Sequence, residues 1–450
     1  MNPDLHETKI VVLDDDPTGS QTVHSCLLLT RWDVDTLLEA LDDAAPLFFV
    51  LTNTRGMDAQ RAASVAREVC HNLELALERR EKQGRPVKPI LVSRSDSTLR
   101  GHYPVETDVM AEELGPFDAH FLIPAFFEGG RITVDGVHFL KVDGRPVPVA
   151  ETEFARDSVF GYRHSDLPHY VEEKTGGRIR ADQVERFGLA DLRTGCLDRL
   201  MHLSGNVCCA VDAERQDDLN RFAVDLLAAA RQGKRFLFRS AASLITALAR
   251  LPPQPVPAAK MAAYVREGRP GAVIVGSHVA KTTAQLGKLL EQPGIAPIEV
   301  DVGRLPDGRA ALVTAVCQVV AEAHAQGLTP VIYTSRAELA FATRAERLAF
   351  GEVVSATLVD IVRGLPPTLG FLISKGGITS NDVLSTGLAL RTARVVGQIL
   401  AGCSVVRCPP DHPRHPDLPV VIFPGNVGDE DALALVYQRL ARLDIRAAAW

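Results

Sequence analysis

The sequence lacks the features expected of a membrane-spanning, secreted or nucleic-acid-binding protein. No uninterrupted apolar run is long enough to cross a bilayer, and the polar residues from Met1 to Lys9 do not read as a signal peptide. The eight cysteines include no C-x-x-C pair, which indicates a reduced chain rather than a disulfide framework. The formal net charge of -7 gives no support for a nucleic-acid or membrane-surface partner. We therefore expect a soluble, cytoplasmic, globular protein.

Short apolar runs recur along the chain, with helical patterns between them. Examples are Ile10–Leu13, Leu47–Leu51 and Ala272–Val275. These runs are continuous rather than alternating, which is typical of strands that are covered on both faces. We therefore predict an α/β fold in two domains, each a mostly parallel sheet flanked by helices.

A proline-rich segment gives the clearest domain boundary. Its four prolines lie between Pro252 and Pro257, and proline cannot continue a helix or a central strand. At 450 residues the chain is also too long for one ordinary core. We predict an N-terminal domain over 1–250, a linker over 251–260 and a C-terminal domain over 261–450.

Polar clusters follow the expected strands of the N-terminal part. In parallel α/β sheets the carboxyl ends of strands meet at one edge, where ligands bind. The clusters are D-D-D-P-T-G (Asp14–Gly19), T-N-T-R-G (Thr52–Gly56), S-R-S-D-S-T-L-R-G (Ser93–Gly101) and I-P-A-F-F-E-G-G-R (Ile123–Arg131).

Convergence of these clusters would place acidic and basic side chains together. Arginine binds a carboxylate through two parallel hydrogen bonds, and aspartate and hydroxyl side chains suit sugar hydroxyls. The composite predicts a pocket for a small polyhydroxylated acid, with an aspartate available as general base. The alternative is a set of capped turns joined by structural salt bridges. The charged residues concerned are Asp14, Asp15, Asp16, Asp96, Arg55, Arg94, Arg100 and Arg131.

Turns and loops, three of them containing glycine, follow the expected strands of the C-terminal part. Glycine lets backbone amides approach a phosphate, so together the turns predict a nucleotide or phosphate site, although each alone could be an ordinary turn. None matches a P-loop, and none matches G-x-G-x-x-G at a strand end. The segments are Val275–Thr283, Thr334–Ala337, Ser374–Asp382 and Phe423–Asp431.

One rival interpretation rests on the first cluster. Asp14-x-Asp16-x-Thr18 after an apolar strand fits D-x-D-x-T, the signature of haloacid-dehalogenase-type phosphatases, in which the first aspartate is the nucleophile. The remaining roles would have to come from residues such as Lys375, far beyond the proline segment. This phosphatase stays as an alternative.

Several isolated side chains carry weaker signals. His412-x-x-His415 lies between prolines, and we expect a solvated loop there rather than a metal site. Lys281 and Lys375 could each contact a phosphate or lie solvated at a helix start. No metal ligands are predicted.

As a set, the motifs resemble the four-carbon acid sugar kinase family. They are D-D-x-T-G, T-x-T-R and D-S-T-L-R-G in the first half, then G-S, G-G-x-T and P-G-N-x-G in the second. Their order and spacing match, and the resemblance covers nearly the whole chain. It implies an N-terminal sugar-acid-binding domain and a C-terminal ATP-binding domain. It also implies phosphorylation of threonate, erythronate or 3-oxo-tetronate at the terminal hydroxyl.

The resemblance implies residues for both ligands. For the acid, with Arg100 added from the strand-end argument, they are Asp15 or Asp16, Arg55, Ser93, Arg94, Ser95, Asp96 and Arg100. For ATP they are Ser277, Gly376, Gly377, Ile378, Thr379, Gly425, Asn426 and Gly428.

These observations lead to the hypothesis of an ATP-dependent sugar-acid kinase. The C-terminal turns would hold ATP, and Mg²⁺ would bridge its phosphates. Asp16 is the first choice, and Asp96 the second, for the base that accepts the hydroxyl proton. A non-catalytic sugar-acid-binding protein is the other alternative, and a homodimer is the default oligomer.

Overall fold

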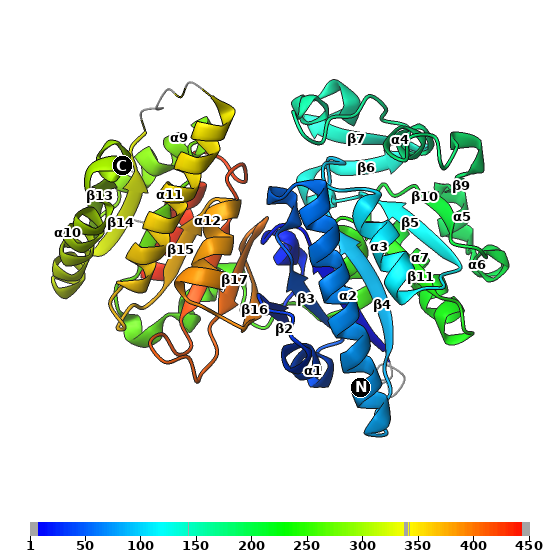
Figure 1. The fold of residues 1–450 in the computed structure, drawn as a ribbon, viewed down its shortest axis with the longest axis horizontal. Coiled ribbons are helices and arrows are strands. Elements are labelled where there is room, and N and C mark those ends of the chain that lie inside the picture. Colours follow the sequence, from blue (N-terminus) through cyan, green and yellow to red (C-terminus); the bar gives the residue numbers. More distant parts are fainter. Residues whose placement is uncertain (1–7, 143, 337–340, 342, 443–450) are drawn as a thin grey trace. The chain divides into compact units, whose positions relative to one another are not determined.

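The structure is a computed structural model that describes residues 8–142, 144–336, 341 and 343–442. The chain divides into two compact units, Met1–Pro252 and Pro253–Trp450, each containing a mostly parallel sheet with covering helices (Figure 1). The runs Ile10–Leu13, Leu47–Leu51 and Ala272–Val275 lie in strands, as predicted. The predicted fold class is therefore confirmed.

All strand pairs in the large sheet of the first unit are parallel. Asp14 is level with Leu51 on one side and with Arg94 on the other, and Ser240 is level with Arg94 and Ile123. The polar clusters that follow these strands therefore begin at one edge. In order across the sheet the strands are β2 (Cys26–Leu29), β3 (Leu47–Leu51), β1 (Thr8–Asp14), β4 (Lys88–Arg94), β11 (Phe236–Ser240), β5 (Ala119–Ile123), β10 (Val207–Val211) and β9 (Glu185–Phe187).

Helix α2 shows how the covering helices form. Asp58 caps it by accepting a hydrogen bond from the Arg61 N–H at 2.8 Å. Its apolar face, which includes Val69 and Leu73, belongs to the same hydrophobic core cluster as Val11 of β1. The α-helices of the unit are α1 (Val34–Asp42), α2 (Ala59–Lys82), α3 (Val105–Leu114), α4 (Leu167–Lys174), α5 (Leu189–Thr194), α6 (Leu197–His202), α7 (Gln216–Arg231) and α8 (Ala242–Ala249).

A small antiparallel sheet, which the sequence analysis did not predict, lies at the carboxyl edge of the large one. It contains β6 (Arg131–Val134), β7 (Val137–Val142) and β8 (Arg145–Pro148). Thr133 exchanges backbone hydrogen bonds at 2.9 Å with Ala213, which closely follows β10. The short 3₁₀ helices of the unit are η2 (Gly19–Thr22), η3 (Thr54–Gly56), η4 (Phe127–Gly129), η5 (Val149–Glu151), η6 (Glu153–Arg156) and η7 (Ala181–Gln183).

The sheet of the second unit is parallel over its first five strands and antiparallel over its last two pairs. The antiparallel edge, a hairpin that turns at Gly402, was not predicted. Across the sheet the strands are β13 (Ile295–Val300), β14 (Thr329–Thr334), β12 (Ala272–Val275), β15 (Leu372–Lys375), β18 (Pro419–Phe423), β17 (Cys403–Arg407) and β16 (Thr392–Leu400).

The helices of the second unit cover both faces of this sheet. Among the described residues, none of the helices has the length and apolar character needed to cross a membrane. The helices are α9 (Ala280–Leu290), α10 (Leu305–Ala325), α11 (Arg344–Arg363), α12 (Gly377–Asp382), α13 (Ala432–Ala441), the 3₁₀ helices η8 (Ala258–Tyr264), η9 (Arg266–Gly268) and η10 (Val302–Arg304), and the π-helical turn η11 (Val383–Gly387).

The proline-rich segment is held against β16. The Gln254 side chain accepts a hydrogen bond from the Gln398 N–H at 2.9 Å and donates to the Gln398 carbonyl at 3.1 Å. A side chain on Gly397 would collide with Gln254, since a Cβ there would lie 2.7 Å from Oε1. The segment is therefore fixed to the sheet of the second unit from Gln254 onward.

Candidate functional site

Asp14 lies at the end of β1 and is fully buried. Neither carboxylate oxygen has a hydrogen-bond partner among the described residues, and Arg94 Nη1 lies 3.5 Å away. A Cβ on Gly19 would lie 2.0 Å from Asp14 Oδ2, so a side chain at that position would collide with the carboxylate. Burial raises the pKa of Asp14 to about 8, against the opposing effect of Arg94. A carboxyl that is fully buried in this way is not accessible to a substrate, which argues against the phosphatase alternative.

Arg55 holds the next two carboxylates. Its Nη2 and Nε contact the two oxygens of Asp15 at 2.5 and 3.3 Å, and its Nη1 lies 3.3 Å from Asp16 Oδ2. Burial raises the pKa of Asp15, although Arg55 opposes this. Burial also acts on Asp16, but Arg55 and hydrogen bonds from Thr18 outweigh it and hold the pKa of Asp16 below its usual value. The side chain of Asp16 is 21% exposed and that of Asp15 is 1% exposed, so Asp16 is the one that a ligand can reach.

The loop after β4 carries Asp96. Its carboxylate accepts hydrogen bonds from Thr98 Oγ1 and, at 2.8 Å, from Arg100 Nε. Burial acts to raise the pKa of Asp96, but Arg55 and Arg100 outweigh it and hold the pKa well below its usual range. Since a carboxylate that ionises so readily is a weak base, Asp96 suits charge placement better than proton transfer.

A buried ion pair that the sequence analysis missed supports this edge. Arg239 Nη1 donates to Glu106 Oε2 and to Ser93 Oγ, both at 2.6 Å, while Glu106 Oε1 accepts from Thr54 Oγ1 at 2.5 Å. The network ties β11, α3, β4 and the turn after β3 together. A signal was present, because Arg239 follows the apolar run Phe236–Phe238 in the way that the other polar clusters follow their strands.

The predicted acid-binding residues thus lie along one edge but differ in access. Those buried against protein partners are Asp15, Ser93, Arg94 and Ser95. Those with exposed surface are Asp16, Arg55, Asp96 and Arg100.

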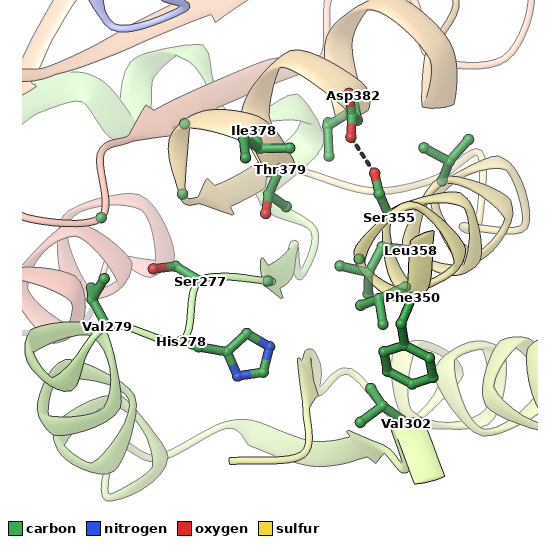
Figure 2. A pocket seen from close by; sticks show the side chains of 18 of the residues that line it. Ser277, His278, Val279, Val302, Phe350, Ser355, Leu358, Ile378, Thr379 and Asp382 are labelled. Atoms are coloured by element: carbon green, nitrogen blue, oxygen red, sulfur yellow. Dashed lines mark hydrogen bonds between the residues drawn. The ribbon is translucent and has the colours of Figure 1, made fainter. Parts of the chain in front are cut away.

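In the second unit, residues that follow the carboxyl ends of β12, β13, β14, β15 and β18 line a cavity of about 640 Å³ (Figure 2). The turns after β12 and β15 bring Ser277 and Thr379 to its lining, and Gly425 follows β18. A Cβ on Gly276 would lie 2.3 Å from Thr379 Oγ1 and 3.0 Å from Leu358 Cδ1. Glycine at this position therefore lets the side chains of Thr379 and Leu358 pack against the turn after β12.

Most of the predicted nucleotide residues line this cavity. Asn426 and Gly428 are outside its lining: Asn426 is exposed, with its carbonyl 3.4 Å from Lys281 Nζ, and Gly428 lies against Ala432. Ala337, the last residue of one predicted segment, lies outside the described residues. The residues that do line the cavity are Ser277, Gly376, Gly377, Ile378, Thr379 and Gly425.

The opposite wall of the cavity comes from α11, which no motif marked. Phe350 and Leu358 give it an apolar surface, and Ser355 Oγ donates a hydrogen bond to Asp382 farther along the wall (Figure 2). Arg336, which follows β14, also lines the cavity, and its Nη1 donates to the Ser277 carbonyl at 2.8 Å. The cavity therefore combines glycine turns, two arginines (Arg336 and Arg347) and an apolar wall.

Lys375 is neither solvated nor in the cavity lining. Its Nζ donates to the Pro424 carbonyl at 2.6 Å and to the Gly425 carbonyl at 3.3 Å, and it lies 4.1 Å from the centroid of the Phe423 ring. Burial lowers the pKa of Lys375 to about 7. The prediction of a solvated or phosphate-contacting lysine is therefore wrong, and Lys375 instead positions the loop that begins at Gly425.

Within the described ranges, no group of three or more histidine, cysteine, aspartate or glutamate residues is arranged to hold a metal ion. His412 Nε2 bonds the Leu388 carbonyl at 2.8 Å, and its Nδ1 accepts from the His415 N–H at 2.9 Å. His412 is thus occupied in shaping its loop.

Comparison with known proteins agrees with this division into two kinds of site. Residues 10–248 match a family model described as a sugar-binding N-terminal domain, and residues 272–433 match one described as a nucleotide-binding C-terminal domain. The first match alone spans more than half of the chain. The chain belongs to the four-carbon acid sugar kinase family.

A curated relative of this family member is a D-erythronate kinase from Heliobacterium modesticaldum, 31% identical over 160 residues. The match spans 33% of this chain and 32% of the relative, about a third of each.

Two crystal structures share the fold. Haemophilus influenzae protein HI1011 is 18% identical with a TM-score of 0.64, covering 96% of this chain and 100% of its own. A Salmonella typhimurium LT2 protein, provisionally assigned as a tRNA synthase, is 20% identical with a TM-score of 0.66, covering 95% and 98%. At these identities both structures inform on the fold alone.

Proposed function

We propose that the chain is an ATP-dependent kinase that phosphorylates the terminal hydroxyl of a four-carbon sugar acid: threonate, erythronate or 3-oxo-tetronate. The observation that carries the proposal is the cavity of the second unit, where glycine turns face an apolar wall. Membership of the family and the partial match to a D-erythronate kinase support the substrate class.

The cavity suits ATP in size and lining. Its volume of about 640 Å³ is typical of small-ligand pockets. The glycine turns at Gly276 and at Gly376 and Gly377, which line the cavity, would present backbone amides to phosphate oxygens. Arg336 would add positive charge, and the wall formed by Phe350 and Leu358 would contact the base.

Mg²⁺ would enter with the nucleotide. This ion usually keeps several waters and binds one or two carboxylates together with phosphates, so it does not require a cluster of three protein ligands. Asp382, a carboxylate in the cavity lining, is the candidate ligand. When bound, Mg²⁺ neutralises charge on the phosphates.

In the first unit, Asp16 would accept the proton of the attacking hydroxyl. It is partly exposed, and Arg55 and Thr18 fix its carboxylate through hydrogen bonds. Arg55 would also shield the negative charges of Asp15 and Asp16 from the acid. Asp96, the second choice from the sequence, is the weaker candidate, because Arg55 and Arg100 hold its pKa well below its usual range.

The proposal is tested by ADP release from purified protein with ATP and Mg²⁺. The panel of acceptors is D- and L-threonate, D- and L-erythronate and the 3-oxo acids. We expect turnover with one of them. Acid binding without ADP release would instead favour a non-catalytic sugar-acid-binding protein, and failure to bind ATP would remove the second-unit assignment.

A further inference from the structure

Arginines at the carboxyl edge of the first unit differ in whether a carboxylate lies beside them. Arg55, Arg94, Arg100 and Arg239 each have a carboxylate oxygen within 4.0 Å. Arg131 has none among the described residues, although it lies in the same group of strand-end clusters.

Arg131 is held in place by its own turn. It is the first residue of β6, and its guanidinium folds back so that Nη1 donates to the Gly129 carbonyl. Its Cζ lies 6.0 Å from the centroid of the Phe126 ring. A Cβ on Gly129 would lie 2.3 Å from Arg131 Nη1 and 2.5 Å from the Phe126 ring, so glycine leaves the room that this arrangement needs.

The position of Arg131 is also fixed relative to Asp96. His138 of β7 bonds through Nε2 to the Ser97 carbonyl at 2.8 Å and through Nδ1 to Thr133 Oγ1 of β6 at 2.9 Å. These contacts attach the small sheet to the loop that carries Asp96. Arg131 therefore lies on a rigid element beside the predicted acid site.

A half-buried cation without an anion is unfavourable. The Nε of Arg131 is buried and has no hydrogen-bond partner in the described part of the chain. Burial lowers the pKa of Arg131; Asp96 opposes this effect and Arg100 adds to it. A charge in this state needs a counterion, and a guanidinium N–H forms a charge-assisted hydrogen bond with a carboxylate.

We propose that Arg131 binds the carboxylate of the acid substrate and thereby selects sugar acids over neutral polyols. The identity of the acid rests on the proposed function. In this arrangement Arg55, whose donors already contact Asp15 and Asp16, is a positioning residue for those carboxylates.

The test is calorimetric titration of the full chain, without nucleotide, with each four-carbon acid and its matching polyol, such as D-erythronate and erythritol. Arg131→Met should weaken acid binding about 10- to 100-fold and leave polyol binding unchanged. Arg131→Lys should recover part of the loss. Gly129→Ala should weaken acid binding without changing any charge, because it displaces the guanidinium. The matched control is Arg145→Met, which removes an exposed arginine of the same small sheet and should change neither affinity.

A thermal unfolding measurement separates this role from a structural one. Without ligand, the Tm of Arg131→Met should be unchanged or a few degrees higher, because a costly charge is removed. A lower Tm together with retained selectivity for the acid would overturn the proposal, as would a wild-type chain that binds none of the acids. A wild-type chain that binds an acid but transfers no phosphoryl group would overturn the proposed kinase and leave the role of Arg131 supported.

Discussion

The carboxyl edge of the first unit and the cavity of the second deal with charge differently. At the first edge, acidic side chains and arginines form ion pairs within the protein, as in Arg55 with Asp15 and Arg239 with Glu106. The cavity is instead lined by glycine turns and an apolar helix wall, with few charged side chains. We therefore expect ligand binding at the first site to be sensitive to the loss of one charge. Binding at the second site should be sensitive to the addition of a few atoms to the cavity lining.

The most severe test removes charge from Asp16. Asp16→Asn should lower kcat by roughly 10²–10⁴, because the amide cannot accept the hydroxyl proton. Steady-state ADP release measures this, and exposed Asp182→Asn is the matched control. A near-normal kcat would exclude Asp16 as the base. It would also contradict the expectation that the first site is sensitive to the loss of one charge.

Breaking the buried pair is the next largest change. Arg239→Met should lower the free energy of unfolding by about 3–5 kcal/mol, because Glu106 would keep a buried charge without its partner. Denaturant unfolding measures this. Arg221→Met, which breaks an exposed pair with Asp217, should cost at most about 1 kcal/mol. Equal losses in the free energy of unfolding would show that the buried pair contributes no more to stability than the exposed pair.

Adding one methyl group tests the cavity. Gly276→Ala should raise the KM for ATP about 10- to 100-fold, because the new Cβ would collide with Thr379, while acid affinity stays the same. The control is Gly287→Ala on α9, where a Cβ meets no atom within 4 Å. An unchanged KM for ATP would place the nucleotide away from this turn.

The smallest expected effect is a pH dependence from Lys375. Its pKa is lowered to about 7 in the folded chain, below the usual 10.5, so the unfolded chain binds more protons between these values. The stability contribution is present above pH 10.5 and is lost as pH falls toward 7, with a slope of at most about 1.4 kcal/mol per pH unit. Thermal unfolding at pH 7 and 9 should show this slope in the wild type and in exposed Lys260→Met, but not in Lys375→Met. Parallel curves for wild type and Lys375→Met would contradict the shift.

The fold class could be predicted because buried parallel strands leave continuous apolar runs, such as Leu47–Leu51. The small sheet was missed for a physical reason. β8 is only four residues long and contains two prolines, and β7 mixes polar and apolar residues without a clear period. Short strands of this kind are stabilised by their neighbours more than by their own pattern.

The site could be predicted as a set of converging segments, but not as a set of roles. Asp14, Asp15 and Asp16 are identical in the sequence, and only tertiary packing makes two of them buried and one accessible. The wall of the cavity at Phe350 and Leu358 arises from packing of α11 and has no local motif. The roles assigned to individual residues stay predictions.

The Arg131 guanidinium, which has no carboxylate partner within the described part of the chain, has a consequence for how variants of this chain would fare under selection. Screening a mutant library only for protein that survives heating should enrich neutral residues at position 131, because they remove an uncompensated charge. Growth that depends on a sugar acid should eliminate the same variants. The frequency of variants at position 131 would then differ between the two selections. That difference would measure how much thermal stability the chain loses by keeping an arginine that binds the acid.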